Sequence, residues 1–181
     1  MSAWQETTLG EVCDAVHGLI QTGPFGSQLH QSDYSEHGVP VVMPMDIVEG
    51  RISSETVARV SGDHVDRLSR HKLSSGDIVY GRRGDIGRQA LIRSEQEGWM
   101  CGTGCLRIGL GESILNPLFL HYYLCQDEVV GWITNQAVGA TMPNLNTGIL
   151  RSVPVRYPPL PIQRRIAGIL SAYDDLIENS Q

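Results

Sequence analysis

Short runs rich in hydrophobic residues recur along most of the chain, and glycines and prolines separate them. Such runs, bounded by turn residues, are typical of short strands. A longer amphipathic stretch, residues 118–133, follows Asn116-Pro117, a pair typical of a helix start. Ser61 opens a shorter helical pattern, and residues 9–16 form another. The expected strands are residues 4–9, 39–45, 56–60, 77–80, 89–92, 99–101, 105–110 and 153–157.

The last segment has a different pattern. After Pro158-Pro159-Leu160-Pro161, apolar residues recur at spacings of 4, 3, 4 and 3, which is a heptad seam rather than a broad globular face. We therefore expect an α+β fold, a mixed α/β domain with a C-terminal coiled-coil-like helix that favours a partner. A helix folded back on its own domain is the alternative. The residues of this seam are Ile162, Ile166, Ile169, Tyr173 and Leu176.

Composition places the chain among ordinary globular proteins. Its 181 residues are 41% hydrophobic and 19% charged, enough for one substantial core. No apolar run approaches the roughly 18 residues of a membrane span, and the first residues lack the basic and apolar regions of a secretory signal. We expect a cytoplasmic protein without a membrane segment.

Charge is distributed unevenly along the chain. The net charge is −6, yet residues 67–93 hold seven Arg or Lys residues and two acids. Within this basic segment, Arg82 and Arg83 lie between glycines, at the tip between two expected strands. Because the arginine fork binds phosphates and guanine edges with paired hydrogen bonds, the segment indicates a nucleic-acid surface. The alternative is a solvated surface with salt bridges to Asp77 and Asp85.

Motifs for catalysis are missing from the sequence. The single lysine, Lys72, follows His71, so a phosphate-binding GxxxxGK[ST] loop is excluded, and no GxSxG occurs. The four cysteines form no CxxC pair and the histidines no HxxxH, so we expect buried, reduced thiols and no metal. We expect no catalysis by this chain. A small enzyme that uses Cys101 or Cys105 with a histidine is an alternative.

Six motifs together resemble the specificity subunit of type I restriction–modification systems, over nearly the whole chain. The last one, PPLPIQRRIAGILSAYDDLI, is the most specific and is similar to the entrance of that family's spacer helix. The motifs are WQETTLGE (4–11), GPFGSQL (23–29) with DY (33–34), GVPVV (38–42), LSSGDIVYGRRGDIGR (73–88), GATMPNLN (139–146) and PPLPIQRRIAGILSAYDDLI (158–177).

The resemblance implies a DNA target recognition domain over residues 1–157 and the start of a spacer or dimerisation helix over residues 158–181. Family members normally contain two such halves, each recognising half of a split double-stranded DNA site. Their helices dock two methyltransferase subunits, which use S-adenosylmethionine to methylate adenine, and restriction subunits add ATP- and Mg-dependent translocation and cleavage. The chain itself would bind no cofactor. It is either a fragment or a natural half-subunit that works as a homodimer.

The sequence therefore predicts a non-catalytic component that recognises one half of a bipartite DNA site. The alternative is a structural adaptor that binds a protein partner through the C-terminal helix; a basic segment would serve no purpose in such an adaptor. Base contacts require arginine and amide side chains on loops held by a scaffold. The expected DNA-binding residues are Arg82, Arg83, Arg88, Arg70, Lys72, Ser27, Gln28, Asn144 and Asn146.

Overall fold

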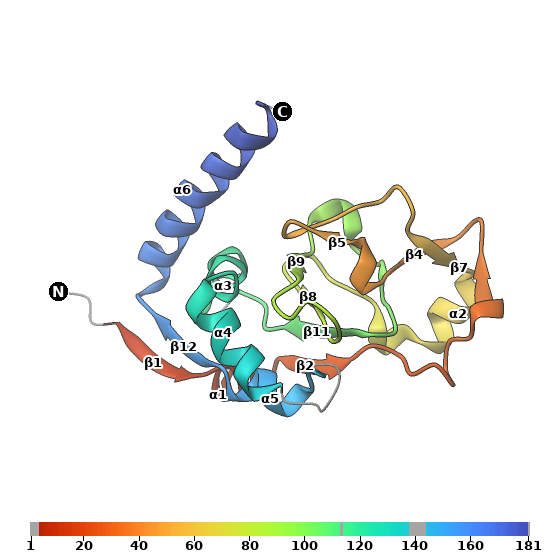
Figure 1. The fold of residues 1–181 in the computed structure, drawn as a ribbon, viewed down its shortest axis with the longest axis horizontal. Helices are drawn as coiled ribbons and strands as arrows, with labels where there is room; N and C mark the ends of the chain where they lie inside the picture. The colour runs from red at the N-terminus through yellow and green to blue at the C-terminus, as the bar shows by residue number, and fades with distance from the viewer. Residues whose placement is uncertain (1–3, 113, 138–143, 181) are drawn as a thin grey trace.

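The computed structural model describes residues 4–112, 114–137 and 144–180 and confirms a mixed α/β fold with a C-terminal helix (Figure 1). The strands are β1 (Gln5–Thr8), β2 (Leu19–Thr22), β3 (Tyr34–Ser35), β4 (Val39–Val42), β5 (Ile47–Val48), β6 (Arg51–Ile52), β7 (Ala58–Val60), β8 (Ile78–Gly81), β9 (Gln89–Leu91), β10 (Met100–Cys101), β11 (Cys105–Gly109) and β12 (Pro154–Tyr157). The helices are α1 (Leu9–Ala15), α2 (Gly62–Arg67), α3 (Pro117–Leu124), α4 (Asp127–Gln136), α5 (Thr147–Ser152) and α6 (Leu160–Glu178). Four 3-10 turns complete them: η1 (Gln31–Asp33), η2 (Pro44–Asp46), η3 (Ser69–His71) and η4 (Ser94–Gln96).

Two four-stranded sheets carry most of the strands. One has the order β2-β11-β8-β9 and is antiparallel throughout, with Tyr80 on β8 opposite Gln89 on β9. The other has the order β10-β4-β7-β3, in which only the β10–β4 pair is parallel. The expected strands 77–80 and 89–92 thus form a true hairpin, and its arginine-bearing turn lies at the end of a central strand.

Both faces of the first sheet are buried. Ile78 and Tyr80 point into the main core, which also contains residues of α1, α3, α4 and α5. Val79, one position along, points into a second core with Val42 and Leu73. This alternation follows from the two-residue period of a strand, and it leaves the hairpin on a rigid base.

The two ends of the domain meet in a separate ribbon. Strand β1 pairs antiparallel with β12, so Gln5 lies opposite Tyr157. Thr8 caps α1 by accepting a hydrogen bond from the Glu11 backbone N–H, while the Glu11 side chain accepts one from Thr8. This reciprocal pair satisfies two N–H groups that the helix start would otherwise leave open. Helix α6 then continues from β12 (Figure 1).

The expected helix over residues 118–133 is two helices. Asn116 caps α3 as expected, with its side-chain oxygen accepting from the Phe119 N–H. The chain then breaks at Gln126, whose backbone is extended, and α4 begins at Asp127. Two acids at the start of α4, Asp127 and Glu128, favour a helix N-terminus because they complement its dipole.

The GATMPNLN motif, residues 139–146, which reads as a polar loop in the sequence, falls partly outside the described residues, which resume at Asn144. Asn146 caps α5 by accepting a hydrogen bond from the Ile149 N–H at 2.9 Å. Helix α5, which has six residues, was not predicted from the sequence.

Helix α6 packs on α3, and its buried residues lie in its first half. Gln163 is fully buried: it donates to the carbonyls of Ile114 and Pro158 and accepts from the Asn116 N–H. Ala167, one turn later, is also buried. Although α6 is the longest helix, no helix in the described parts of the chain has the length and apolar character needed to cross a membrane.

Candidate nucleic-acid interface

Arg82 lies at the start of the hairpin turn and is tied to the fold. Its backbone N–H donates to the Gly104 carbonyl at 2.8 Å, and its carbonyl accepts from the Leu145 N–H at 2.9 Å. Its Nε donates to the Leu145 carbonyl at 3.1 Å. The Arg82 guanidinium therefore joins the hairpin to the segment before α5, in addition to any contact with a ligand.

Arg83 is the exposed member of the pair. It forms an isolated bridge with Asn144, so the arginine hairpin and the 139–146 motif meet although they lie far apart in sequence. None of the ion pairs among residues 4–112, 114–137 and 144–180 involves Arg83. Gly84 follows with a φ of +80°, a conformation that glycine adopts without strain. The tip thus presents one arginine and one amide side by side.

Arg88, on the returning side of the turn, is exposed but partnered. Its Nη2 donates to Asp85 at 2.8 Å and its Nη1 to the Pro44 carbonyl at 3.3 Å. The alternative drawn from charge, salt bridges within the basic segment, is therefore right for Arg88 and Asp85. An exposed pair of this kind stabilises by at most about 1 kcal/mol, so a phosphate can compete for Arg88.

Asp77 pairs with an arginine outside the basic segment. Its carboxylate accepts from Arg107 Nε at 2.7 Å, and both side chains are buried. Burial raises the pKa of Asp77, while hydrogen bonds from the Ser74 N–H and the Arg107 guanidinium lower it. This buried ion pair joins Arg107 of β11 to Asp77, the residue before β8.

Arg70 and Lys72 flank a buried histidine. Arg70 is exposed and donates through Nε to His71 Nε2 at 3.1 Å. The Arg70 carbonyl accepts from Gln21 and from Arg107. Burial, with Arg70 and Arg107 nearby, lowers the pKa of His71 to about 4, so the ring is neutral at pH 7. Lys72 is half-buried and forms an isolated bridge with Met100.

The loop with Ser27 and Gln28 has its own support. Gln28 accepts the Phe25 N–H through its amide oxygen, and its carbonyl accepts from Arg67 of α2. Ser27 is exposed. The structure therefore places the nine expected residues in two groups. Arg82, Arg83, Arg88, Asn144 and Asn146 gather around the hairpin turn. The other four lie apart from it: Gln28, next to Ser27, is tied to α2, Arg70 contacts β2 and β11, and Lys72 pairs with Met100.

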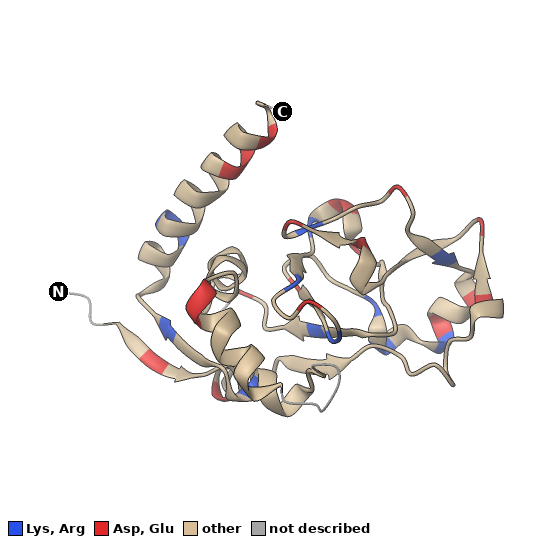
Figure 2. Cartoon of the chain, viewed as in Figure 1, with Lys and Arg blue, Asp and Glu red and all other residues tan. Residues whose placement is uncertain are grey.

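Figure 2 shows basic residues on the segment around β8 and β9, and acidic residues towards the end of α6. The acids on α6 contact the domain: Asp175 and Glu178 pair with Arg51 at 3.6 and 2.7 Å, and Asp174 accepts from the Tyr122 hydroxyl.

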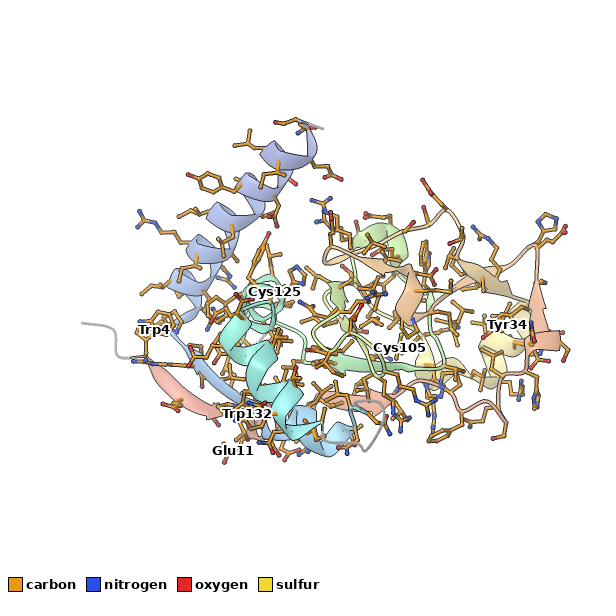
Figure 3. All side chains as sticks on the ribbon, viewed as in Figure 1. Trp4, Glu11, Tyr34, Cys105, Cys125 and Trp132 are labelled. Atoms are coloured by element: carbon orange, nitrogen blue, oxygen red, sulfur yellow. The ribbon has the colours of Figure 1, made fainter. Side chains whose placement is uncertain are left out.

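The cysteines agree only partly with the expectation. Cys13, Cys101 and Cys105 are buried, whereas Cys125 is exposed at the junction of α3 and α4 (Figure 3). Its sulfur accepts from Gln89 Nε2 at 2.9 Å. Burial raises the pKa of the Cys101 thiol to about 12 and holds the pKa of the Cys105 thiol well above its usual range, so both thiols are protonated at neutral pH. A protonated buried thiol is a poor nucleophile, which weakens the small-enzyme alternative.

The expected seam of α6 lies mainly in solvent. Ile169, Tyr173 and Leu176 are 51%, 63% and 63% exposed, and Ile162 is 37% exposed. Ile166 differs because it is half-buried and packs against the main core. The buried face with Gln163 and Ala167 is a different face of the same helix.

The sequence did not single out Pro44, Gly104 and Leu145, whose backbone carbonyls accept from Arg88 and Arg82. These contacts are backbone-mediated, and no side-chain pattern marks them. Pro44 is of a residue type that marks a turn in the sequence, and it is the first residue of η2.

Comparison with known proteins gives one consistent result. The family described as type I restriction modification DNA specificity domain matches residues 1–181. The specificity subunit of type I restriction enzyme MjaVIII from Methanocaldococcus jannaschii is 26% identical over 97% of this chain and 40% of its own length. The EcoBI specificity subunit from Escherichia coli is 25% identical over 97% of this chain and 36% of its own. The chain thus spans about two fifths of these relatives.

Solved structures show the same fold. The HsdS subunit from Thermoanaerobacter tengcongensis superimposes with a TM-score of 0.69 at 23% identity, covering 98% of this chain and 43% of that one. The S subunit from M. genitalium gives a TM-score of 0.65 at 18% identity, covering 98% and 41%. The fold with its terminal helix is therefore a recurrent one.

Proposed function

Because the chain belongs to the family of type I restriction modification DNA specificity domains, we propose that it recognises one half of a bipartite double-stranded DNA site. The observation that carries this proposal is the arginine hairpin, where exposed Arg83 lies beside Asn144 at the end of a sheet buried on both faces. Arginine and amide side chains are the groups that distinguish guanine and adenine edges in the major groove.

The chemistry of restriction and modification would reside on partner subunits. Relatives of this chain are named specificity subunits. We propose that methyltransferase subunits supply adenine methylation with S-adenosylmethionine, and that a restriction subunit joins the complex and uses ATP and Mg. The chain itself would bind no cofactor and act in the cytoplasm. Residues 1–157 would form the recognition domain and residues 158–181 the start of the spacer helix.

The exposed seam of α6 supports a second role, that of a docking helix. Its partner would be a helix of the same kind, either from the other half of a longer subunit or from a second copy of this chain. Methyltransferase subunits would then contact the paired helices. A pure adaptor would use this seam alone, without the hairpin.

Titration of DNA binding against salt tests the function and separates it from the adaptor. The chain, with its methyltransferase subunit, is mixed with a duplex recovered by selection from random DNA. Recognition predicts a sequence-dependent affinity, together with a fall in log affinity as log salt rises because phosphate contacts release counterions. An adaptor would bind its protein partner and leave every duplex unbound at low salt.

A further inference from the structure

Met45 is an apolar side chain held in solvent next to the arginine hairpin. At 73% it has the largest exposed fraction among the large hydrophobic side chains of the described residues. Single exposed apolar residues are common on protein surfaces, so exposure alone does not indicate a binding role. Two further observations concern the turn that holds Met45 and the residues beside it.

The turn η2 fixes the position of Met45. Asp46, which is 2% exposed, accepts the Met43 N–H through its carboxylate at 2.8 Å. The Asp46 carbonyl accepts the Ser53 N–H, also at 2.8 Å, and its N–H donates to the Met43 carbonyl. Because the residues on both sides of Met45 are hydrogen-bonded or, for Pro44, conformationally restricted, its exposure is a property of the folded turn rather than of a loose loop.

The same turn packs on the arginine hairpin. The Pro44 carbonyl accepts from Arg88 Nη1, and the Pro44 ring lies against Gly104, where a Cβ atom would be 3.3 Å from Pro44 Cγ. The Gly104 carbonyl in turn accepts the Arg82 N–H. Met45 is thus the direct neighbour of Pro44, which contacts Arg88. Through Gly104, Pro44 is also linked to Arg82.

A base-pair edge in the major groove presents one apolar group, the C5-methyl of thymine. Methionine suits a contact with it because its side chain is flexible and polarisable. We propose that Met45 is a specificity-determining residue that packs on a thymine methyl group within the DNA site contacted by the hairpin. This inference rests on the proposed function, since it requires a duplex bound to that face.

Replacement of thymine by uracil tests the contact, because it removes only the methyl group. Duplexes from the selection are synthesised with single deoxyuridine substitutions, and each is titrated with the wild-type chain and Met45→Ala in the presence of the methyltransferase subunit. At one thymine, we expect the deoxyuridine substitution to lower the affinity of the wild type about threefold to fivefold, which is the effect of one buried methyl group. Met45→Ala should bind the unmodified duplex more weakly by a similar factor. Deoxyuridine at the same position should not lower the affinity of this variant further.

Two variants serve as controls. Met45→Leu should retain most of the affinity and the sensitivity to deoxyuridine, because it keeps an apolar side chain. Ile114→Ala, which removes an exposed apolar side chain beside the base of α6, should match the wild type. Sensitivity that is equal in the wild type and in Met45→Ala at every thymine, or a selected site without thymine, overturns the inference. Unstacking of a base step by the wild type but not by Met45→Ala also overturns it, because Met45 would then insert between base pairs rather than pack on a methyl group. Absence of sequence-dependent binding by the wild type would instead contradict the proposed function.

Discussion

Arg82 and Arg83 are adjacent in sequence but have different surroundings. The Arg82 side chain donates to the Leu145 carbonyl, whereas Arg83 is exposed beside Asn144. We expect Arg83→Ala to weaken DNA binding and leave the melting temperature unchanged. If Arg83 contacts a base, discrimination at one position should fall by about 1–3 kcal/mol; if it contacts a phosphate, affinity should fall evenly and the salt slope should flatten.

Arg82→Ala should lower both DNA affinity and thermal stability, because it also removes the side-chain hydrogen bond from Arg82 Nε to the Leu145 carbonyl and leaves only the backbone bond between these residues. Parallel melting and binding curves of the two single variants check this difference. Unchanged affinity of Arg83→Ala at moderate salt would contradict the assignment of the hairpin to DNA.

Two buried histidines make stability depend on pH. Burial lowers the pKa of both His71 and His121 to about 4, from a usual value of 6.5. Between these values the unfolded chain binds protons that the folded chain excludes, so these two groups lower the free energy of unfolding as pH falls from 6.5 to 4. The raised pKa values of buried Asp46 and Asp77 act in the opposite direction.

A comparison with His121→Gln isolates one histidine. The glutamine side chain can keep the hydrogen bond to Gln89, which His121 Nδ1 makes at 3.0 Å. Denaturant unfolding from pH 7 to 4 should show a weaker loss of stability in the variant than in the wild type. Parallel curves for the two proteins would show that His121 does not titrate in this window.

At the scale of elements, Gln163 attaches α6 to the domain. Gln163→Ala would leave the Asn116 N–H and the carbonyls of Ile114 and Pro158 without this partner in a buried position. We expect a loss of about 1–3 kcal/mol, measured as a lower denaturant midpoint with an unchanged slope. Arg165→Ala, on the exposed surface of the same helix, is the control and should stay within about 0.5 kcal/mol. Equal midpoints for both variants would exclude this role.

The docking role of the α6 seam can be tested by substitutions at seam positions other than Ile166. Because Ile166 packs on the main core, an aspartate there would damage the domain, so Ile169 and Tyr173 are the positions to change. Ile169→Asp with Tyr173→Asp should abolish self-association or methyltransferase binding while the recognition domain stays folded. Gly168→Asp adds charge off the seam, where a Cβ atom meets nothing within 4 Å, and should retain binding. A double variant that sediments and binds like the wild type would rule out docking through the seam.

At the scale of the whole molecule, the parts predicted from sequence are those with local signals. Short hydrophobic runs and the glycines between them predicted the β8–β9 hairpin, and the Asn116-Pro117 pair predicted the start of α3. Helix α5 was missed because six residues after a polar stretch carry too little periodicity. The double role of Arg82 could not be predicted, since its partner Leu145 lies 63 residues away.

The candidate site shows the same limit. Residue type and charge identified the arginines, but they could not separate exposed Arg83 from tethered Arg82 or from Arg88, which pairs with Asp85. They also grouped Arg70 and Lys72 with the hairpin, although these flank His71, and their contacts are with Gln21, Arg107 and Met100 instead. Such distinctions depend on long-range packing, which only the folded chain supplies.

The most direct test of DNA recognition is selection of bound sequences from random duplexes by the complete chain with its methyltransferase subunit, repeated with Arg83→Ala. We expect one enriched motif with the wild type and, with the variant, either loss of information at a single position or a uniform loss of affinity with a flatter salt slope. An identical motif recovered with equal affinity by both proteins, or no enrichment with the wild type, would contradict it.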